Sequence, residues 1–90
     1  MDKRNSPGNP STNEIMLRHL TVDEALLKLD QFLHDAFMAG LLQVRVIHGK
    51  GGGKLRDVVR KKLKQHPLVK SYRPGDYGEG DSGVTIVEFT

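Results

Sequence analysis

The chain has 90 residues, no cysteine and a formal net charge of +3. A chain of this length forms one domain with a single modest core, and without cysteine it has neither a disulfide framework nor a cysteine-based zinc site. No segment approaches the roughly 18 apolar residues of a membrane span, and the N-terminus lacks the apolar run of a signal peptide, so we expect no membrane partner and a cytoplasmic location.

Residues 1–13 are rich in Asn, Ser, Pro and Gly without periodicity, and we expect them to be a disordered N-terminal linker. Ordered structure should begin at Glu14 with a short strand over residues 14–20. Thr21 and Glu24 form a capping box, and apolar side chains then recur at i, i+3, i+4 and i+7. This pattern predicts a helix that ends at Gly40.

The second half of the chain predicts a strand over residues 42–48, a helix over 54–65, and strands over 69–73 and 84–89. The order βαβαββ indicates a two-layer α/β sandwich with a four-stranded mixed sheet and two helices. The first two strands are joined through a helix and should be parallel with a right-handed crossover, whereas the last two should be antiparallel.

Charge is distributed unevenly along the chain. Residues 45–73 hold ten Lys and Arg against one acid, Asp57, for a net charge of +9, whereas residues 21–40 carry a net charge of −3. This asymmetry favours a positive face directed at a polyanion. The alternative is that the cations only keep a helix well solvated.

Residues 49–54 form a loop of four glycines and two lysines between an expected strand and an expected helix. Glycine lets backbone N–H groups approach an anion, so the loop predicts a phosphate site, unless the glycines serve only a tight turn. The loop does not match the nucleotide-binding Walker motif, because His48 stands where that motif needs Gly and Leu55 stands where it needs Ser or Thr. It does not match the dinucleotide-binding GxGxxG motif either, because Lys54 occupies the last Gly position. Gly49–Gly52 matches the GxxG of KH domains, but that loop joins two helices.

His48 stands at the end of a strand beside this loop. A histidine there can donate to a phosphate or exchange a proton near neutral pH, and the alternative is a structural hydrogen bond. No pair of histidines has the spacing of metal ligands, so no metal site is predicted.

Three blocks resemble the Smr (small MutS-related) domain over residues 14–90: EIMLRHLTVDEAL, QVRVIHGKGGGKLR and HPLVKSYRPGDYGEGDSGVTIVEF. They are most similar to the version at the C-terminus of MutS-II-type MutS homologues. The resemblance implies a βαβαββ sandwich similar to the C-terminal domain of bacterial translation initiation factor three. It also implies binding of DNA or RNA, often with nicking or cleavage, and a role in processing branched or recombining DNA.

The same resemblance implies further partners. Other Smr proteins act on messenger RNA at stalled ribosomes, so ribosome association is an expectation that the family brings. The linker-like residues 1–13 favour a chain that is the C-terminal part of a longer MutS-like protein.

Two family motifs carry the activity that the resemblance implies. The HGxG motif is present at His48–Gly51. The other motif, LDLH or LDLR followed by Gly, falls on residues 15–19, where Arg18 matches the LDLR variant. Met16 takes the acidic position and His19 takes that of the usual Gly. Methionine can neither accept a proton nor hold a cation.

We therefore expect an endonuclease or nickase in which His48 handles the proton while Arg18 and Lys50 stabilise the charge of the transition state. The residues expected to hold backbone phosphates are Gly49, Lys50, Gly51, Gly52, Gly53, Lys54, Arg56, Arg60 and Arg73. No cofactor is expected, and a divalent metal would lack a visible ligand set.

Two alternatives stay open beside the endonuclease. The first is a catalytically inactive module, without the acid at position 16, that brings a larger MutS-like protein to nucleic acid. The second is a protein-docking module, whose binding would depend little on salt.

Overall fold

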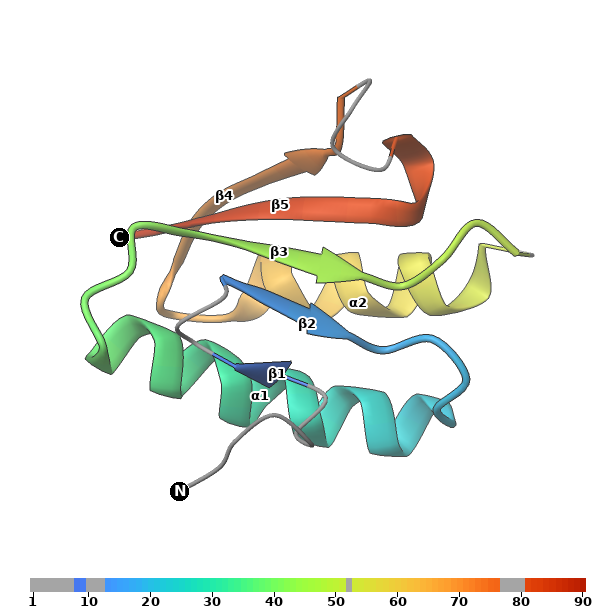
Figure 1. Ribbon diagram of the computed structural model, residues 1–90, viewed down its shortest axis with the longest axis horizontal. Helices are drawn as coiled ribbons and strands as arrows, with labels where there is room; N and C mark the ends of the chain where they lie inside the picture. The colour runs from blue at the N-terminus through green and yellow to red at the C-terminus, as the bar shows by residue number, and fades with distance from the viewer. Residues whose placement is uncertain (1–7, 10–12, 52, 77–80) are drawn as a thin grey trace.

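The computed structural model describes residues 8–9, 13–51, 53–76 and 81–90. It contains a five-stranded sheet in the order β1-β2-β3-β5-β4, with two helices packed against it (Figure 1). The elements are β1 (Gly8–Asn9), β2 (Glu14–Met16), α1 (Val22–Met38), β3 (Gln43–Ile47), α2 (Lys54–Gln65), β4 (Val69–Pro74), the short 3₁₀ helix η2 (Asp81–Gly83) and β5 (Val84–Phe89).

The predicted two-layer α/β sandwich is confirmed. The four expected strands and both helices are present; β2 runs parallel to β3, and β4 runs antiparallel to β5. The first strand is shorter than predicted and ends at Met16. It ends there because the chain turns directly afterwards: the Leu20 N–H donates to the Leu17 carbonyl, and His19 has a positive φ of 72°.

The sheet has one strand that the sequence did not predict. Gly8 and Asn9, within the segment expected to be disordered, pair antiparallel with Ile15 and Glu14 of β2. A two-residue strand carries no hydrophobic period, so the sequence gives no signal for it. The remainder of the expected linker, residues 1–7 and 10–12, lies outside the described residues.

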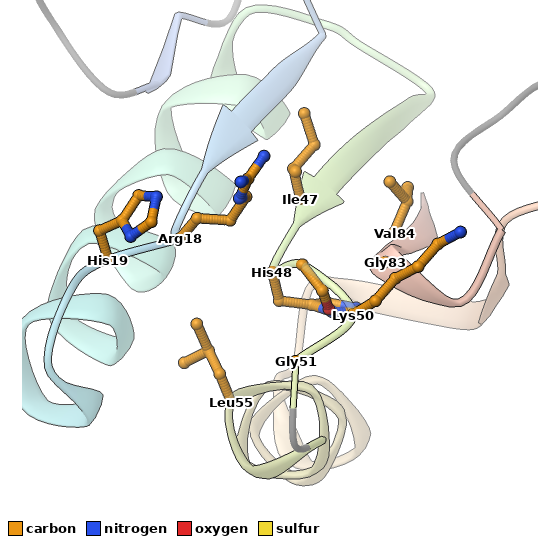
Figure 2. Close-up of a pocket in the computed structure, with 10 residues that line it drawn as sticks. Arg18, His19, Ile47, His48, Lys50, Gly51, Leu55, Gly83 and Val84 are labelled. Carbon is orange, nitrogen blue, oxygen red and sulfur yellow. The ribbon is translucent and has the colours of Figure 1, made fainter.

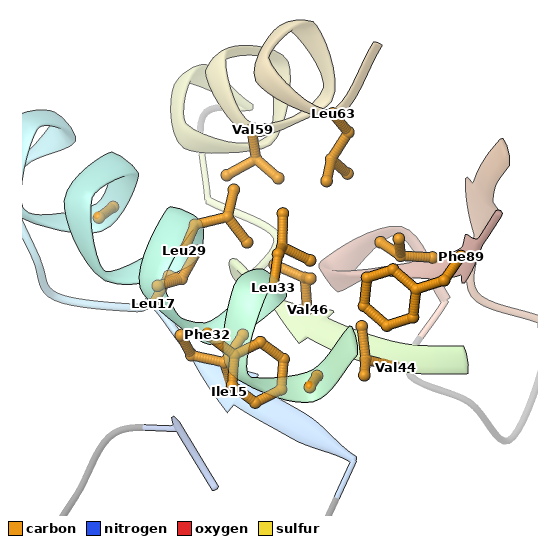
Figure 3. Packing of buried hydrophobic residues seen from close by; sticks show 13 residues of the cluster. Ile15, Leu17, Leu29, Phe32, Leu33, Val44, Val46, Val59, Leu63 and Phe89 are labelled. Carbon is orange, nitrogen blue, oxygen red and sulfur yellow. The ribbon is translucent and has the colours of Figure 1, made fainter. Parts of the chain in front are cut away.

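Both helices contribute to a single hydrophobic core on one face of the sheet (Figure 3). The buried side chains of this core are Ile15, Leu17, Ala25, Leu29, Phe32, Leu33, Ala36, Val44, Val46, Val59, Leu63, Val87 and Phe89. The capping box at the start of α1 is formed as predicted, with the Glu24 N–H donating to the Thr21 hydroxyl at 3.1 Å. Neither helix, over the part of the chain that the structure describes, is long and apolar enough to cross a membrane.

The sheet order brings three strand ends together. β3 lies between β2 and β5, parallel to the first and antiparallel to the second. The C-terminal ends of β2 and β3 therefore meet the N-terminal start of β5 at one edge of the sheet. The segments that follow β2 and β3 carry the two predicted family motifs.

Two leucines of α1 test the core. We expect Leu33→Ala to lower the free energy of unfolding by about 2–5 kcal/mol, because Leu33 is fully buried between the helices and the sheet. Leu27→Ala is the matched control on the same helix; this side chain is 76% exposed, so its loss should cost less than about 0.5 kcal/mol. Urea denaturation of both variants measures the difference, and equal losses would contradict the described packing.

Candidate functional site

A pocket of about 700 Å³ lies at the sheet edge where the ends of β2 and β3 meet the start of β5 (Figure 2). Its lining comes from the turn after β2, the glycine loop after β3, the first turn of α2 and the η2–β5 junction. The lining residues are Arg18, His19, Ile47, His48, Gly49, Lys50, Gly51, Leu55, Gly83 and Val84. The structure thus brings together the three predicted catalytic residues, Arg18, His48 and Lys50.

Gly83 anchors the glycine loop to β5. Its carbonyl accepts hydrogen bonds from the His48 N–H at 3.0 Å and the Gly49 N–H at 2.9 Å. A Cβ on Gly83 would lie 3.1 Å from Lys50 Cγ and 3.4 Å from the Gly49 carbonyl carbon, so a larger residue would displace the loop. Gly83 is not among the predicted site residues, although it stands in the third of the blocks that resemble the Smr domain.

Gly49 provides the contact between the two motifs. It has a φ of +85°, and a Cβ on it would lie 3.2 Å from Arg18 Cγ and 3.5 Å from Arg18 Cδ. The aliphatic part of Arg18 therefore lies against the Gly49 backbone, and a side chain at position 49 would require Arg18 to shift. The positive φ and this close contact both favour glycine here.

The turn after β2 explains a second family feature. His19, at the position of the usual Gly, has a φ of 72°, in the left-handed region where residues other than glycine carry a cost of about 1–2 kcal/mol. A glycine at this position would adopt the same φ without that cost. This chain accepts the strain and places an imidazole on the rim of the pocket.

His48 is 5% exposed, and both of its ring nitrogens have partners inside the protein. Nε2 lies 2.8 Å from the Thr85 hydroxyl, and Nδ1 lies 3.1 Å from the Gly49 carbonyl oxygen. A carbonyl only accepts, so Nδ1 carries the proton in the neutral ring and Nε2 accepts from Thr85. Proton transfer by His48 requires the ring to give up one of these bonds.

The surroundings of His48 favour its neutral form. Burial lowers the pKa of His48 most strongly; the hydrogen bond to the Gly49 carbonyl opposes this, and the nearby positive charges of Arg60 and Arg56 lower the pKa further. The histidine that the sequence singled out for proton exchange is therefore held below its ordinary titration range.

The structure uses two of the predicted glycine N–H groups internally. The Gly49 N–H donates to Gly83, and the Gly53 N–H donates to the Gly51 carbonyl at 2.6 Å. Gly53 is the N-cap of α2, with a φ of +80° and no side-chain cap. These groups shape the loop, whereas Gly52 lies outside the described residues.

The cations predicted to hold backbone phosphates lie in four different places. Lys50 lines the pocket, whereas Lys54 and Arg56 lie at the start of α2, with Arg56 folded over Gly53. Arg60 is turned inward and donates from Nε to the Thr85 hydroxyl at 3.1 Å. Arg73, on β4, is outside the pocket lining and pairs with Asp76 at 3.5 Å.

Over the residues that the structure describes, no carboxylate lines the pocket. Met16, at the expected acidic position, is 43% exposed and outside the lining. Two nearby acids could substitute for it by sequence position. Glu14, however, pairs with Arg45, and Glu88 accepts from Ser71 at the far end of β5. Within the described residues, no three His, Cys, Asp or Glu side chains group as a metal site would require.

Alanine substitutions at three glycines distinguish the cost of a positive φ from the cost of steric contact with a neighbouring side chain. Gly40 has a φ of +83° with open space around its Cβ position, whereas Gly49 has a similar φ and contacts Arg18. We expect Gly40→Ala to lower the free energy of unfolding by about 1 kcal/mol and Gly49→Ala by a further ~1 kcal/mol. Gly51→Ala, in open space, should be close to neutral. Equal losses at positions 40 and 49 in urea denaturation would contradict the Arg18 contact.

The lowered pKa of His48 predicts a pH dependence of stability. The unfolded chain takes up a proton near pH 6.5, before the folded chain does, so the His48 contribution is fully present above that pH and is lost as the pH falls toward the folded pKa. We expect His48→Gln to lose less stability than the original chain between pH 7.5 and 5. His34→Gln, at an exposed position on α1, controls for removal of a histidine. Parallel pH profiles for His48→Gln and the original chain would refute the assignment.

Comparison with known proteins agrees with this arrangement. Residues 15–90 match the family model of the Smr domain. Among curated proteins, the chain is 58% identical over 74 residues to the Endonuclease MutS2 of Caldicellulosiruptor saccharolyticus, covering 82% of this chain and 9% of that protein. The Endonuclease MutS2 of Lachnospira eligens is 53% identical over 78 residues, covering 87% of this chain and 10% of that protein. The chain thus spans about a tenth of the length of these relatives.

Two solved structures are similar to this one. The Smr domain of Thermus thermophilus MutS2 matches with a TM-score of 0.84 and 45% identity, covering 87% of this chain and 98% of that chain. YdaL, a stand-alone small MutS-related protein from Escherichia coli, matches with a TM-score of 0.80 and 29% identity, covering 89% of this chain and 66% of that chain. The family match, the fold and the paired motifs at the pocket lead to the same conclusion: the chain belongs to the Smr domain family.

Proposed function

We propose that this Smr domain binds the sugar-phosphate backbone of DNA or RNA at the pocket beside the glycine loop. The observation that carries the proposal is that Arg18 and Lys50 both line this pocket, one in the segment after β2 and the other in the loop after β3 (Figure 2). A phosphate bound in the pocket would have two cations among its neighbours, and the surrounding chain from residue 45 to 73 has a net charge of +9.

The start of α2 extends this surface. Lys54 and Arg56 occupy the first turn of the helix, and Gly53 leaves its N-terminus without a side-chain cap. The first N–H groups of a helix attract anions, so a second phosphate of the same strand would lie favourably here. In this form the groups contact phosphates and not base edges, so the proposed binding is independent of sequence.

Cleavage of the bound strand is the second part of the proposal. It is supported by the names of the curated relatives, which are endonucleases, and by the convergence of Arg18, His48 and Lys50. In this form Arg18 and Lys50 stabilise the charge that develops on the phosphate, and His48 supplies or removes a proton after its ring leaves Thr85 or Gly49.

A binding module without cleavage is the competing form. It is favoured by Met16, because methionine provides no carboxylate and, among the described residues, no acid lines the pocket. In this form the domain would bring a longer MutS-like protein to nucleic acid. The two forms share the same binding surface and differ only in the fate of the strand.

Binding predicts a defined dependence on salt. For duplex DNA the logarithm of the association constant should fall with the logarithm of the salt concentration by about 0.9 per phosphate contact. We expect Arg18→Gln and Lys50→Gln each to weaken binding and to reduce this slope by about 1. Lys28→Gln, at an exposed lysine in the acidic segment of α1, should change neither. Fluorescence anisotropy with labelled duplex DNA and single-stranded RNA measures both quantities, and unchanged slopes for the pocket variants would reject the proposed site.

Incubation with supercoiled plasmid, branched DNA and RNA distinguishes the endonuclease from the binding module. The proteins compared are the original chain, His48→Ala and Met16→Asp. Cleavage by the original chain that is lost in His48→Ala supports the endonuclease. Cleavage that appears only after Met16→Asp supports the binding module and rejects the native endonuclease. Purified ribosomes in a co-sedimentation assay test the ribosome association that the family brings.

A further inference from the structure

A chain of hydrogen bonds connects α2, β5 and the glycine loop behind the pocket. Arg60 Nε lies 3.1 Å from the Thr85 hydroxyl, this hydroxyl lies 2.8 Å from His48 Nε2, and His48 Nδ1 lies 3.1 Å from the Gly49 carbonyl. Thr85 is fully buried, although threonine side chains are mostly exposed in proteins. Its hydroxyl is therefore committed to these two partners.

The chemistry of the two end groups fixes the direction of every bond in the chain. The Arg60 guanidinium only donates, so the Thr85 oxygen accepts from it and the Thr85 proton is free to point to His48 Nε2. The Gly49 carbonyl only accepts, so Nδ1 of His48 must carry a proton. A neutral ring protonated at Nδ1 satisfies all four groups at once.

The charges of Arg60 and Arg56, which approach from α2, oppose a second proton on the ring. Arg18, His19 and Lys50 line the same pocket as His48. Protonation at Nε2 would also force the Thr85 hydroxyl to turn away. Arg60 itself is held at a cost, because its Nη2 is buried without a hydrogen-bond partner in the described part of the chain.

We propose that Thr85 and Arg60 are positioning residues that hold His48 as the neutral Nδ1–H tautomer and thereby fix the backbone of the loop at Gly49. The loop then presents Lys50 to the pocket in one conformation. The expected effect on phosphate binding rests on the proposed function, whereas the assignment of the His48 tautomer is independent of it.

The tautomer is tested in the ¹⁵N-labelled chain by the imidazole nitrogen resonances. We expect Nδ1 of His48 in the protonated range and Nε2 in the unprotonated range at neutral pH. Thr85→Ser keeps a hydroxyl and should preserve this pattern. The nearly isosteric Thr85→Val leaves only the Gly49 carbonyl to favour the Nδ1–H form, so it should give a mixture in which the Nε2–H form also appears. A protonated Nε2 in the original chain, or an unchanged pattern in Thr85→Val, would overturn the proposal.

Arg60 is tested by titration of His48, which does not require Thr85 to be changed. Arg60→Met removes both the donor to Thr85 and a nearby charge, so the pKa of His48 should rise. Arg56→Gln removes a nearby charge but leaves the hydrogen-bond chain complete, so it should raise the pKa while preserving the tautomer. Loss of the tautomer in Arg56→Gln, or its full retention in Arg60→Met, would count against the role of Arg60.

Anisotropy with the labelled DNA completes the test. Thr85→Val should bind roughly five- to tenfold more weakly, the loss expected from one buried hydrogen bond, and Thr85→Ser should restore binding. Failure of the original chain to bind would reject the proposed function while the resonances still test the tautomer. Normal binding by Thr85→Val with a lost tautomer would reject the positioning role alone.

Discussion

The close approach of two backbone segments, at Gly49 and Gly83, is the constraint on which the pocket depends. One carbonyl, that of Gly83, accepts the N–H groups of two successive residues and so draws the glycine loop onto the start of β5. Gly49 in turn has the side chain of Arg18 against its Cα, and Gly83 has that of Lys50. The absence of a side chain at these two glycines thus leaves space for Arg18 and Lys50, which both line the pocket.

The elements with a long, regular pattern were predictable from the sequence. Helix α2 begins and ends at the predicted residues, and α1 follows its capping box and apolar stripe closely. The first strand was predicted too long, because Leu17 continues the alternation of a strand although the chain has begun to turn. The pairing of Gly8 and Asn9 depends on tertiary contact that two polar residues do not encode.

The candidate site was predictable only where a motif carries it. The glycine loop and His48 stand out locally, and Arg18 entered through the family pattern. Thr85 gave no such signal, because β5 is buried on both faces and its alternation does not show which residues face α2. Arg60 was expected on the surface with its neighbours, yet the helix turns it toward Thr85. Periodicity indicates the face of a residue but not its hydrogen-bond partner.

The inward turn of Arg60 changes how the basic segment should be understood. Of the ten cations between residues 45 and 73, Arg60 serves a buried hydroxyl, while Arg45, Arg56 and Arg73 have acidic partners. The charge available to an external polyanion is therefore smaller than the sequence total. Position, more than net charge, decides where a strand would lie.

The order of strands in the sheet has a consequence for the glycine loop as a unit. The pocket joins segments that are neighbours in space but distant along the chain, as shown by the Leu17 N–H that donates to the Ile47 carbonyl and by the loop resting on Gly83. A synthetic peptide spanning only the loop and α2 would lack both neighbours. Closing its loop would cost entropy, and the contacts with the sheet that offset this cost in the folded domain would be missing. The glycine loop is therefore not expected to keep its conformation outside this domain, because contacts with β2 and β5 hold it in place.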